Sequence, residues 1–316
     1  MARADRPLRL ATRGSPLARW QADRIGTLLR STGVDSTVVV VETEGDRRAG
    51  VPIDELGGRG VFVREVQAAV SDGRADVAVH SAKDLPASDD LAAPGLVMAA
   101  VPERADPRDL LVGSALSELP PGSVVATGSS RRRAQLANLR ADLSFRELRG
   151  NIGTRLAHVG RGVSAVVVAK AAVDRLGWTP PTGMATEVLE PVVMVPQVAQ
   201  GALAVECRAD DAGVVAALAR IDDAGARTLV DAERAFLAEL GGGCTLPVGA
   251  HARWLGGATD DATGRRFGLV GMVASHDGRT VLRHEDEGVD PVEVGSRVAR
   301  FLLDQAGGRQ LLGWVA

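Results

Sequence analysis

Lysine and tyrosine are almost missing from this chain. Lys83 and Lys170 are the only lysines among 37 Lys and Arg residues, and there is no tyrosine. Arginine therefore carries nearly all of the positive charge, and a retained lysine is less easily explained as a random surface choice. An ammonium group is a compact point charge and a guanidinium is a planar fork. We therefore expect Lys83 to be needed as a lysine.

Cysteine, net charge and long apolar runs are scarce as well. Two cysteines, Cys207 and Cys244, cannot form a disulfide framework, which favours a reducing, cytoplasmic setting. A formal net charge of -3 argues against a nucleic-acid partner. No run approaches the roughly 18 apolar residues that span a bilayer, and the N-terminus lacks the apolar core of a signal peptide. We expect no membrane partner and, because His and Cys are few and scattered, no metal site.

The residues that are present indicate a globular protein of two or three domains. The length is 316 residues, with 45% hydrophobic and 24% charged residues. Short apolar strands alternate with helices, and then the pattern changes. This predicts two α/β lobes at residues 1–101 with 201–221 and at 102–200, followed by a small α+β domain with an antiparallel sheet at 222–316. A double crossover between the lobes is typical of hinged, clamshell binding proteins.

The stretch 75–86, ADVAVHSAKDLP, is the strongest candidate for a catalytic segment. Residues 77–79 form a short buried strand by pattern, and the chain then turns polar with Ser81, Lys83 and Asp84. Open α/β sheets bind ligands beyond such strand ends, which makes Asp84 the first catalytic candidate. The alternative is that Lys83 and Asp84 are a solvated pair on a surface turn.

Arginines follow several of the predicted strands. Arg13 lies between a strand at 8–11 and a helix that Ser15 can cap. A repeated strand, turn and helix pattern in the second lobe puts more arginines at strand ends and helix starts: Arg131, Arg132, Arg149, Arg155 and Arg175. Because positive charge at a helix start opposes the helix dipole, we expect anionic ligands there, with solvated helix faces as the alternative.

Two further segments leave alternatives open. Cys244 follows three glycines, on backbone that other groups can approach closely, but free cysteines are also often buried packing residues. Nothing in the spacing pairs Cys244 with a His/Asp dyad. The polar segment 43–56, with glycines after it, predicts either a mobile lid or an ordinary loop. Cys207 fits a packed small hydrophobe.

Eight strings, in order along the chain, resemble the porphobilinogen deaminase (hydroxymethylbilane synthase) family. They are LATRGSPLARWQA, GGRGVFVREV, ADVAVHSAKDLP, PERADPRD, TGSSRRRAQL, LRGNIGTRL, VPQVAQGALAVECR and ERAFLAELGGGCTLPVG. A single glycine loop would not be specific, but eight ordered strings leave little room for coincidence. The resemblance covers all three predicted domains and is weakest after Trp254.

The resemblance implies a transferase of porphyrin and heme biosynthesis. The family joins four porphobilinogen molecules head to tail with loss of ammonia and yields the linear tetrapyrrole hydroxymethylbilane. It implies two periplasmic-binding-protein-like lobes with a third domain, in a monomeric, cytosolic protein. A dipyrromethane cofactor is held by a thioether to the cysteine that matches Cys244, and the aspartate that matches Asp84 is catalytic.

The resemblance also assigns ligand groups by position. The cofactor-binding positions match Cys244, Lys83, Ser81, Ser129, Arg131, Arg132 and Arg155. The substrate-binding positions match Arg13, Arg149, Arg175 and Gln200. Ser130 stands where leucine is common and Arg133 adds a third arginine, so alignment backwards from Gln135 selects Arg131 and Arg132.

The chemistry of these residues agrees with that activity. Each porphobilinogen brings two carboxylates, which arginines bind, and loss of ammonia leaves a cationic azafulvene that a buried carboxylate stabilises. A non-catalytic clamshell binding protein for a small carboxylate anion is the alternative. It would explain the arginines but neither Cys244 nor a third domain. A phosphate-ester enzyme is weaker, because no P-loop spacing or Mg²⁺ ligand cluster is present.

Overall fold

The computed structural model describes residues 6–43, 63–87, 93–241, 246–256 and 265–313. Contacts between Cα atoms divide the chain into two compact units, residues 1–105 with 202–228 and residues 106–201 with 229–316. The second unit takes in both the predicted second lobe and the predicted third domain, so the boundaries of three separate domains stay a prediction. Within the described ranges, no helix has both the length and the apolar composition that a membrane-spanning segment needs.

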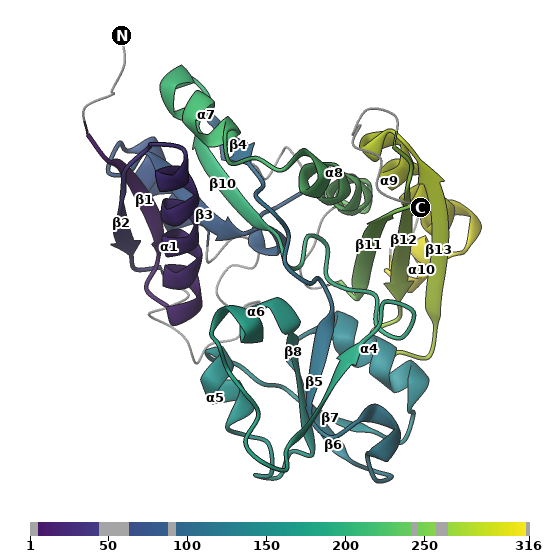
Figure 1. The fold of residues 1–316 in the computed structure, drawn as a ribbon. Coiled ribbons are helices and arrows are strands. Elements are labelled where there is room, and N and C mark those ends of the chain that lie inside the picture. Colours follow the sequence, from purple (N-terminus) through teal and green to yellow (C-terminus); the bar gives the residue numbers. More distant parts are fainter. Residues whose placement is uncertain (1–5, 44–62, 88–92, 242–245, 257–264, 314–316) are drawn as a thin grey trace. The chain divides into compact units, whose positions relative to one another are not determined.

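The first unit is built on a five-stranded sheet with the strand order β2-β1-β3-β10-β4 (Figure 1). Strand β1 pairs in parallel with β2 and β3, whereas β10 runs antiparallel to β3 and β4. The strands are β1 (Leu8–Arg13), β2 (Ser36–Val41), β3 (Val77–Ser81), β4 (Leu96–Ala100) and β10 (Leu203–Arg208). The helices are α1 (Pro16–Ser31), α3 (Arg64–Ser71) and α7 (Ala212–Ala219).

Local sequence explains how α1 is placed against the sheet. The Ser15 hydroxyl accepts a hydrogen bond from the backbone N of Ala18 at 3.3 Å, and Pro16 occupies the first turn. Ile25 and Leu29 on the inner face are fully buried against β1 and β3. Burial of these side chains fixes the start of α1 beside the carboxyl end of β1.

The lobe in the second unit has a second five-stranded sheet, in the order β7-β6-β8-β5-β9. Strand β6 is parallel to β7 and β8, and β5 is antiparallel to β8 and β9. The strands are β5 (Asp109–Gly113), β6 (Val124–Ala126), β7 (Ser144–Arg146), β8 (Ala165–Ala169) and β9 (Ala185–Leu189). The helices are α4 (Ser130–Leu139), α5 (Ile152–Leu156) and α6 (Lys170–Arg175), with a short 3-10 turn at Leu116–Glu118.

The two sheets share one topological device. In each sheet, one antiparallel strand is the first strand after the chain crosses between the lobes. This strand is β5 after the first crossing and β10 after the second. Strand β10 lies between β3 and the edge strand β4, and β5 lies between β8 and the edge strand β9. The double crossover confirms the predicted α/β class with two periplasmic-binding-protein-like lobes.

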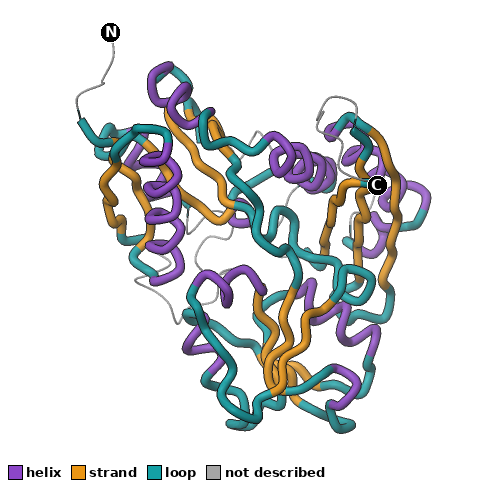
Figure 2. Tube along the Cα trace, in the orientation of Figure 1, coloured by secondary structure: helices purple, strands orange, loops and turns teal. Residues whose placement is uncertain are grey.

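The C-terminal part of the second unit contains the predicted antiparallel sheet, drawn in orange in Figure 2. Its strands β11 (Val248–Trp254), β12 (Phe267–Ala274) and β13 (Val281–Gly288) follow one another as a meander. Helix α8 (Ala224–Glu239) belongs to the second unit from Leu229 onward. Helices α9 (Pro291–Arg300) and α10 (Gly308–Leu311) follow the sheet, with a π-helical turn at Phe301–Gln305.

Within the second unit, this sheet packs directly on helix α4 of the lobe. The turn between β12 and β13 places Gly278 against the backbone of Ala134, where a Cβ has no room, and its φ is +74°. Asn138 donates to the carbonyl of Gly278 at 3.1 Å. The sequence did not predict this contact. It joins the lobe and the C-terminal sheet into one compact unit.

Candidate functional site

The first unit contains an open pocket with an empty volume of about 410 Å³. Three predicted site residues line it together: Arg13, Ser81 and Asp84. Arg13 ends β1, and Ser81 ends β3, so the pocket lies at the carboxyl edge of the sheet, where ligands bind in open α/β folds. The start of α1 forms another wall through Ser15.

A single 3-10 turn, Ala82–Asp84, positions the acid. The backbone N of Ala82 donates to the carbonyl of Ala202 at 3.0 Å, just before strand β10, and Ala82 itself is buried. Leu85 closes the turn by donating to the Ala82 carbonyl at 3.2 Å. The turn is therefore anchored at its base, and Asp84 reaches the pocket from it. Lys83 belongs to the same turn.

Sequence reasoning missed two residues that support this pocket. Gln21, buried on α1, donates from Nε2 to the Ser81 hydroxyl at 2.8 Å. His80 lines the pocket beside Ser81, and its Nε2 lies 3.2 Å from Oε2 of Glu206. A polar residue on the inner face of an apolar helix, as at Gln21, was the available signal.

The partner of His80 comes from the neighbouring strand. Glu206 on β10 lies opposite Ala78, and His80 lies opposite Ala204, so the two larger side chains meet diagonally across small ones. Gln67 on α3 donates to both carboxylate oxygens of Glu206, at 2.9 and 3.2 Å. The buried carboxylate is thus surrounded by polar groups, as burial of a charge requires.

In the second unit, Arg131 and Arg132 surround a buried carboxylate at the start of α4. Asp109 is fully buried, and each arginine lies 2.7 Å from one of its oxygens. Arg131 also donates to the carbonyl of Val195 at 2.6 Å, and Arg132 to that of Val167 at 3.0 Å. The sequence predicted these arginines as ligand groups but did not predict Asp109. The isolated acid at the head of the apolar strand DLLVG was its signal.

Two further predicted residues join this cluster. Ser129 caps α4, with its hydroxyl accepting from the backbone N of Arg132 at 3.4 Å. Gln200 donates to Oδ1 of Asp109 at 2.8 Å. Burial raises the pKa of Asp109, but the charges of Arg131 and Arg132 and the hydrogen bonds outweigh it and hold that pKa well below its usual range.

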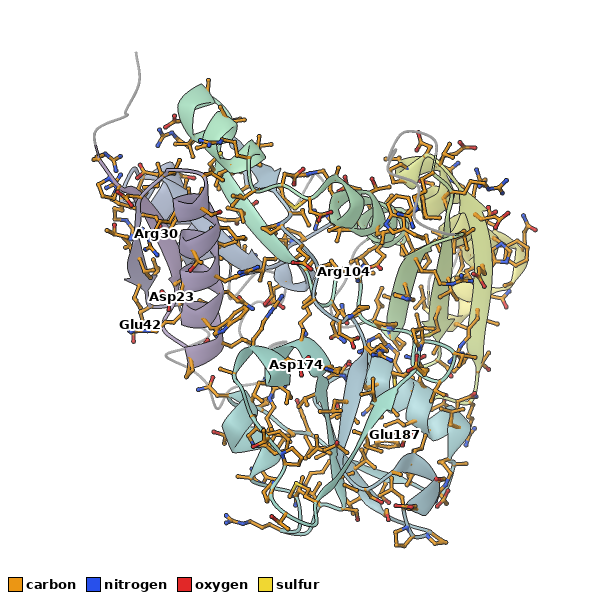
Figure 3. All side chains as sticks on the ribbon, in the orientation of Figure 1. Asp23, Arg30, Glu42, Arg104, Asp174 and Glu187 are labelled. Carbon is orange, nitrogen blue, oxygen red and sulfur yellow. The ribbon has the colours of Figure 1, made fainter. Side chains whose placement is uncertain are left out.

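Three of the remaining predicted arginines belong to other elements of the second unit, Arg149 to the loop after β7, Arg155 to α5 and Arg175 to α6. Arg149 pairs with Glu147 at 2.5 Å at the surface, and Arg155 donates to the Gly150 carbonyl at 2.7 Å. Arg175 follows Asp174, labelled in Figure 3, on α6. Its Nη2 donates to the Gly201 carbonyl at 2.6 Å, and burial lowers the pKa of Arg175 to about 10. The predicted tether Cys244, and the lid segment from residue 44 onward, lie outside the described residues.

Two family models cover most of the chain. The model "Porphobilinogen deaminase, dipyromethane cofactor binding domain" matches residues 8–216, and "Porphobilinogen deaminase, C-terminal domain" matches residues 227–304. Between them they take in both lobe sheets and the antiparallel sheet.

Individual proteins agree with these models. The porphobilinogen deaminase of Mycolicibacterium paratuberculosis is 48% identical over 314 residues, which cover 96% of either chain. That of Nocardia farcinica is 47% identical over 320 residues, covering 98% of this chain and 89% of the relative. Among solved structures, the methionine-binding protein MetQ aligns with 68% of this chain and 89% of its own, at 15% identity and a TM-score of 0.41, too faint a likeness to build on. The chain belongs to the porphobilinogen deaminase family.

Proposed function

We propose that this chain joins four porphobilinogen molecules head to tail, releasing one ammonia at each coupling, to give hydroxymethylbilane. The observation that carries the proposal is the pocket in which Arg13, Ser81 and Asp84 meet at one sheet edge. A guanidinium, a hydroxyl and a carboxylate are the groups that an acidic pyrrole with an N–H and a cationic transition state needs. The activity makes the protein a transferase of tetrapyrrole biosynthesis.

Asp84 is the catalytic carboxylate in this proposal. When the C–N bond of the aminomethyl group breaks, ammonia takes the electron pair and the substrate pyrrole becomes cationic. A fixed carboxylate stabilises that cation without reorganisation and accepts the pyrrole N–H. The α-carbon that is joined must then lose its proton, which ammonia finally carries away as ammonium. Asp84 is suitably placed to pass that proton on.

The arginines hold the carboxylates of the pyrroles. Each added unit brings an acetate and a propionate, so a lengthening chain needs several fixed cations. Arg13, Arg149 and Arg175 are the groups we assign to this task, because guanidiniums bind carboxylates in a two-pronged way, and Gln200 is assigned to the substrate with them. Positions on different elements suit a product whose length changes during the reaction.

The dipyrromethane cofactor fits the cluster around Asp109. Two guanidiniums and one carboxylate leave this buried group with one net positive charge, which favours an added anion. Among the described residues, Nε of Arg131 is buried without a hydrogen-bond partner, and Arg132 keeps N–H donors beyond those that Asp109 and Val167 use. Arg131, Arg132, Ser129 and Arg155 would therefore hold cofactor carboxylates in this unit.

The rest of the proposed cofactor site comes from Ser81, Lys83 and the thioether at Cys244. When bound, the cofactor supplies the nucleophilic pyrrole carbon to which the first substrate is joined. Lys83 and Ser81 would donate hydrogen bonds to its acidic side chains. The chain's own task is to hold these acids, exclude water and keep Asp84 near the reacting carbon.

Intact mass of the purified protein tests the proposal. We expect an added mass equal to two linked pyrrole units on Cys244, a positive Ehrlich colour reaction, and consumption of porphobilinogen with release of ammonia. An unmodified protein that binds porphobilinogen without consuming it would instead support the clamshell binding protein. A cytoplasmic location and a monomeric state belong to the same proposal. Mass photometry of the purified protein checks the monomeric state.

A further inference from the structure

A buried carboxylate in the second unit holds residue 199 in an unusual backbone conformation. Glu233 on α8 is fully buried, and its Oε2 accepts from the backbone N of Ala199 at 2.7 Å. Its Oε1 accepts from the backbone N of Ala252 on β11 at 2.9 Å. Ala199 has a φ of 57°, the only positive φ of a non-glycine residue in the described ranges. Such a conformation costs alanine roughly 1–2 kcal/mol and persists only where the surroundings enforce it.

The chemistry at Glu233 requires a carboxylate. Two backbone donors converge on it, the N–H of Ala199 and the N–H of Ala252. A carboxylate accepts on both oxygens, whereas the amide of a glutamine accepts on one and would point its own NH₂ at the other donor. Glutamine has the same shape, so Glu233→Gln removes this double acceptor without removing volume.

The residue after Ala199 connects this backbone to the arginine cluster. Gln200 is buried, and its Nε2 donates to the carbonyl of Pro107 and to Oδ1 of Asp109, each at 2.8 Å. Asp109 in turn pairs with Arg131 and Arg132. The direction of the Gln200 side chain depends on the backbone at the preceding residue.

We infer that Glu233 is a positioning residue for Arg131 and Arg132. Glu233 holds Ala199 in the left-handed conformation and thereby orients the Gln200 side chain toward Asp109. Asp109 in turn fixes the positions of the two guanidinium groups. The inference rests on the proposed function, in which these arginines hold the cofactor. It assigns the C-terminal part of the second unit a second task, since α8 then orders the cofactor site of the lobe.

The first experiment compares Glu233→Gln with wild type, both produced without cofactor and then given porphobilinogen. Intact mass follows the fraction that gains the dipyrromethane over time. We expect loading to be roughly tenfold slower and kcat of the loaded enzyme roughly tenfold lower, with KM within about twofold, because the loss of one charge-assisted hydrogen bond displaces the primer more than the substrate. Glu239→Gln makes the same change on the same helix, where the carboxylate pairs with Arg300 at the surface, and is expected to load at the wild-type rate.

The second experiment adds Ala199→Gly to Glu233→Gln. Glycine adopts a positive φ without strain, so we expect the double variant to recover loading to within about threefold of wild type. If Glu233 only linked α8 to β11, glycine at position 199 would add flexibility without restoring a hydrogen bond, and the loading rate would not recover. Failure to recover therefore overturns the inference, as does a Glu233→Gln variant that loads like wild type.

A third variant covers the case in which Glu233→Gln does not fold. Gln200→Met leaves the bonds of Glu233 to Ala199 and Ala252 in place and cuts the link to Asp109. It should show the same slow loading, and loading at the wild-type rate would contradict the inference. Wild type tests the proposed function separately. If wild type gains the cofactor and turns over, and all three variants load and turn over at the same rates, the proposed function holds and only the role of Glu233 is refuted.

Discussion

The side-chain amide of Gln21 donates to the hydroxyl of Ser81 at 2.8 Å, from helix α1 to the end of β3. Because the serine oxygen accepts this hydrogen, its own hydrogen is turned away from Gln21 and is available to an acceptor in the pocket. A pyrrole carboxylate is such an acceptor. In the proposed function, Gln21 therefore makes Ser81 a donor toward the ligand.

Replacing Gln21 by methionine keeps the volume and removes the donor. We expect the dipyrromethane to load about three- to tenfold more slowly, with KM for porphobilinogen nearly unchanged, since Ser81 is assigned to the cofactor and one net hydrogen bond is worth about 1 kcal/mol. Ser81→Ala should have a similar effect. Intact mass of both variants and of the pair, followed during loading with porphobilinogen, provides the measurement. Because the two residues act through one bond, the double variant should be no worse than the single ones, and additive losses would refute the coupling.

Asp84→Asn separates charge from shape at the acid. The amide keeps the size of the side chain but cannot stabilise a cationic pyrrole, so we expect kcat to fall by at least roughly 100-fold. The variant should still carry the dipyrromethane, because the groups assigned to the cofactor are unchanged. Intact mass and turnover on the same sample are the measurements. A cofactor-bearing variant with wild-type turnover would remove Asp84 from the mechanism.

Local patterns predicted the fold well because each element follows from neighbouring residues. The Ser15 cap marked the start of α1, and the apolar residues 77–79 marked β3. The carboxyl end of β3 was likewise visible as an apolar run that turns polar at residue 80. These signals placed Arg13, Ser81 and Asp84 at strand ends, where the structure gathers them in one pocket.

Partners distant in the sequence could not be predicted in this way. Gln21 and Ser81 are 60 residues apart, and Ala199 and Glu233 are 34 apart. No periodicity specifies which side chains meet after two sheets have formed. Arg131 shows the consequence, since the helix-dipole argument predicted an anionic ligand near it but could not reveal that Asp109 of the same chain pairs with it.

The pH dependence of stability should reveal the Asp109 cluster. The pKa of Asp109 lies well below its usual range in the folded protein, whereas the unfolded chain has the ordinary value of about 4. The unfolded state therefore takes up protons first as the pH falls. The contribution of Asp109 is complete above about pH 5 and is lost progressively at lower pH, toward the folded-state pKa.

Asp109→Asn tests this assignment. We expect the free energy of unfolding at pH 7 to fall by about 3–5 kcal/mol, because two buried guanidiniums lose their carboxylate. The decline between pH 5 and pH 3 should also become shallower than in wild type. Urea unfolding at several pH values measures both. Asp210→Asn, which weakens only a surface pair with Arg208, should follow the wild-type curve. Equal stability of Asp109→Asn and wild type at pH 7 would show that the cluster is not formed.

Gly249→Ala tests the packing of the C-terminal sheet on the arginine cluster. A Cβ at this position of β11 would lie 2.6 Å from the carbonyl oxygen of Pro196 and 3.0 Å from Cδ of Arg131. That carbonyl already accepts from Ala250 at 3.1 Å, so the backbone cannot move away without breaking this bond. We expect a loss of about 1–3 kcal/mol in the free energy of unfolding. Gly153→Ala is the matched control.

In α5 the added methyl of Gly153→Ala meets nothing within 4 Å, and alanine favours the helix by up to about 1 kcal/mol. Urea unfolding should therefore move the two variants in opposite directions. Two variants that shift together would indicate a general response to glycine replacement. Opposite shifts follow only if β11 lies directly against the Pro196 backbone and Arg131, because nothing intrinsic to alanine destabilises a strand where glycine stood.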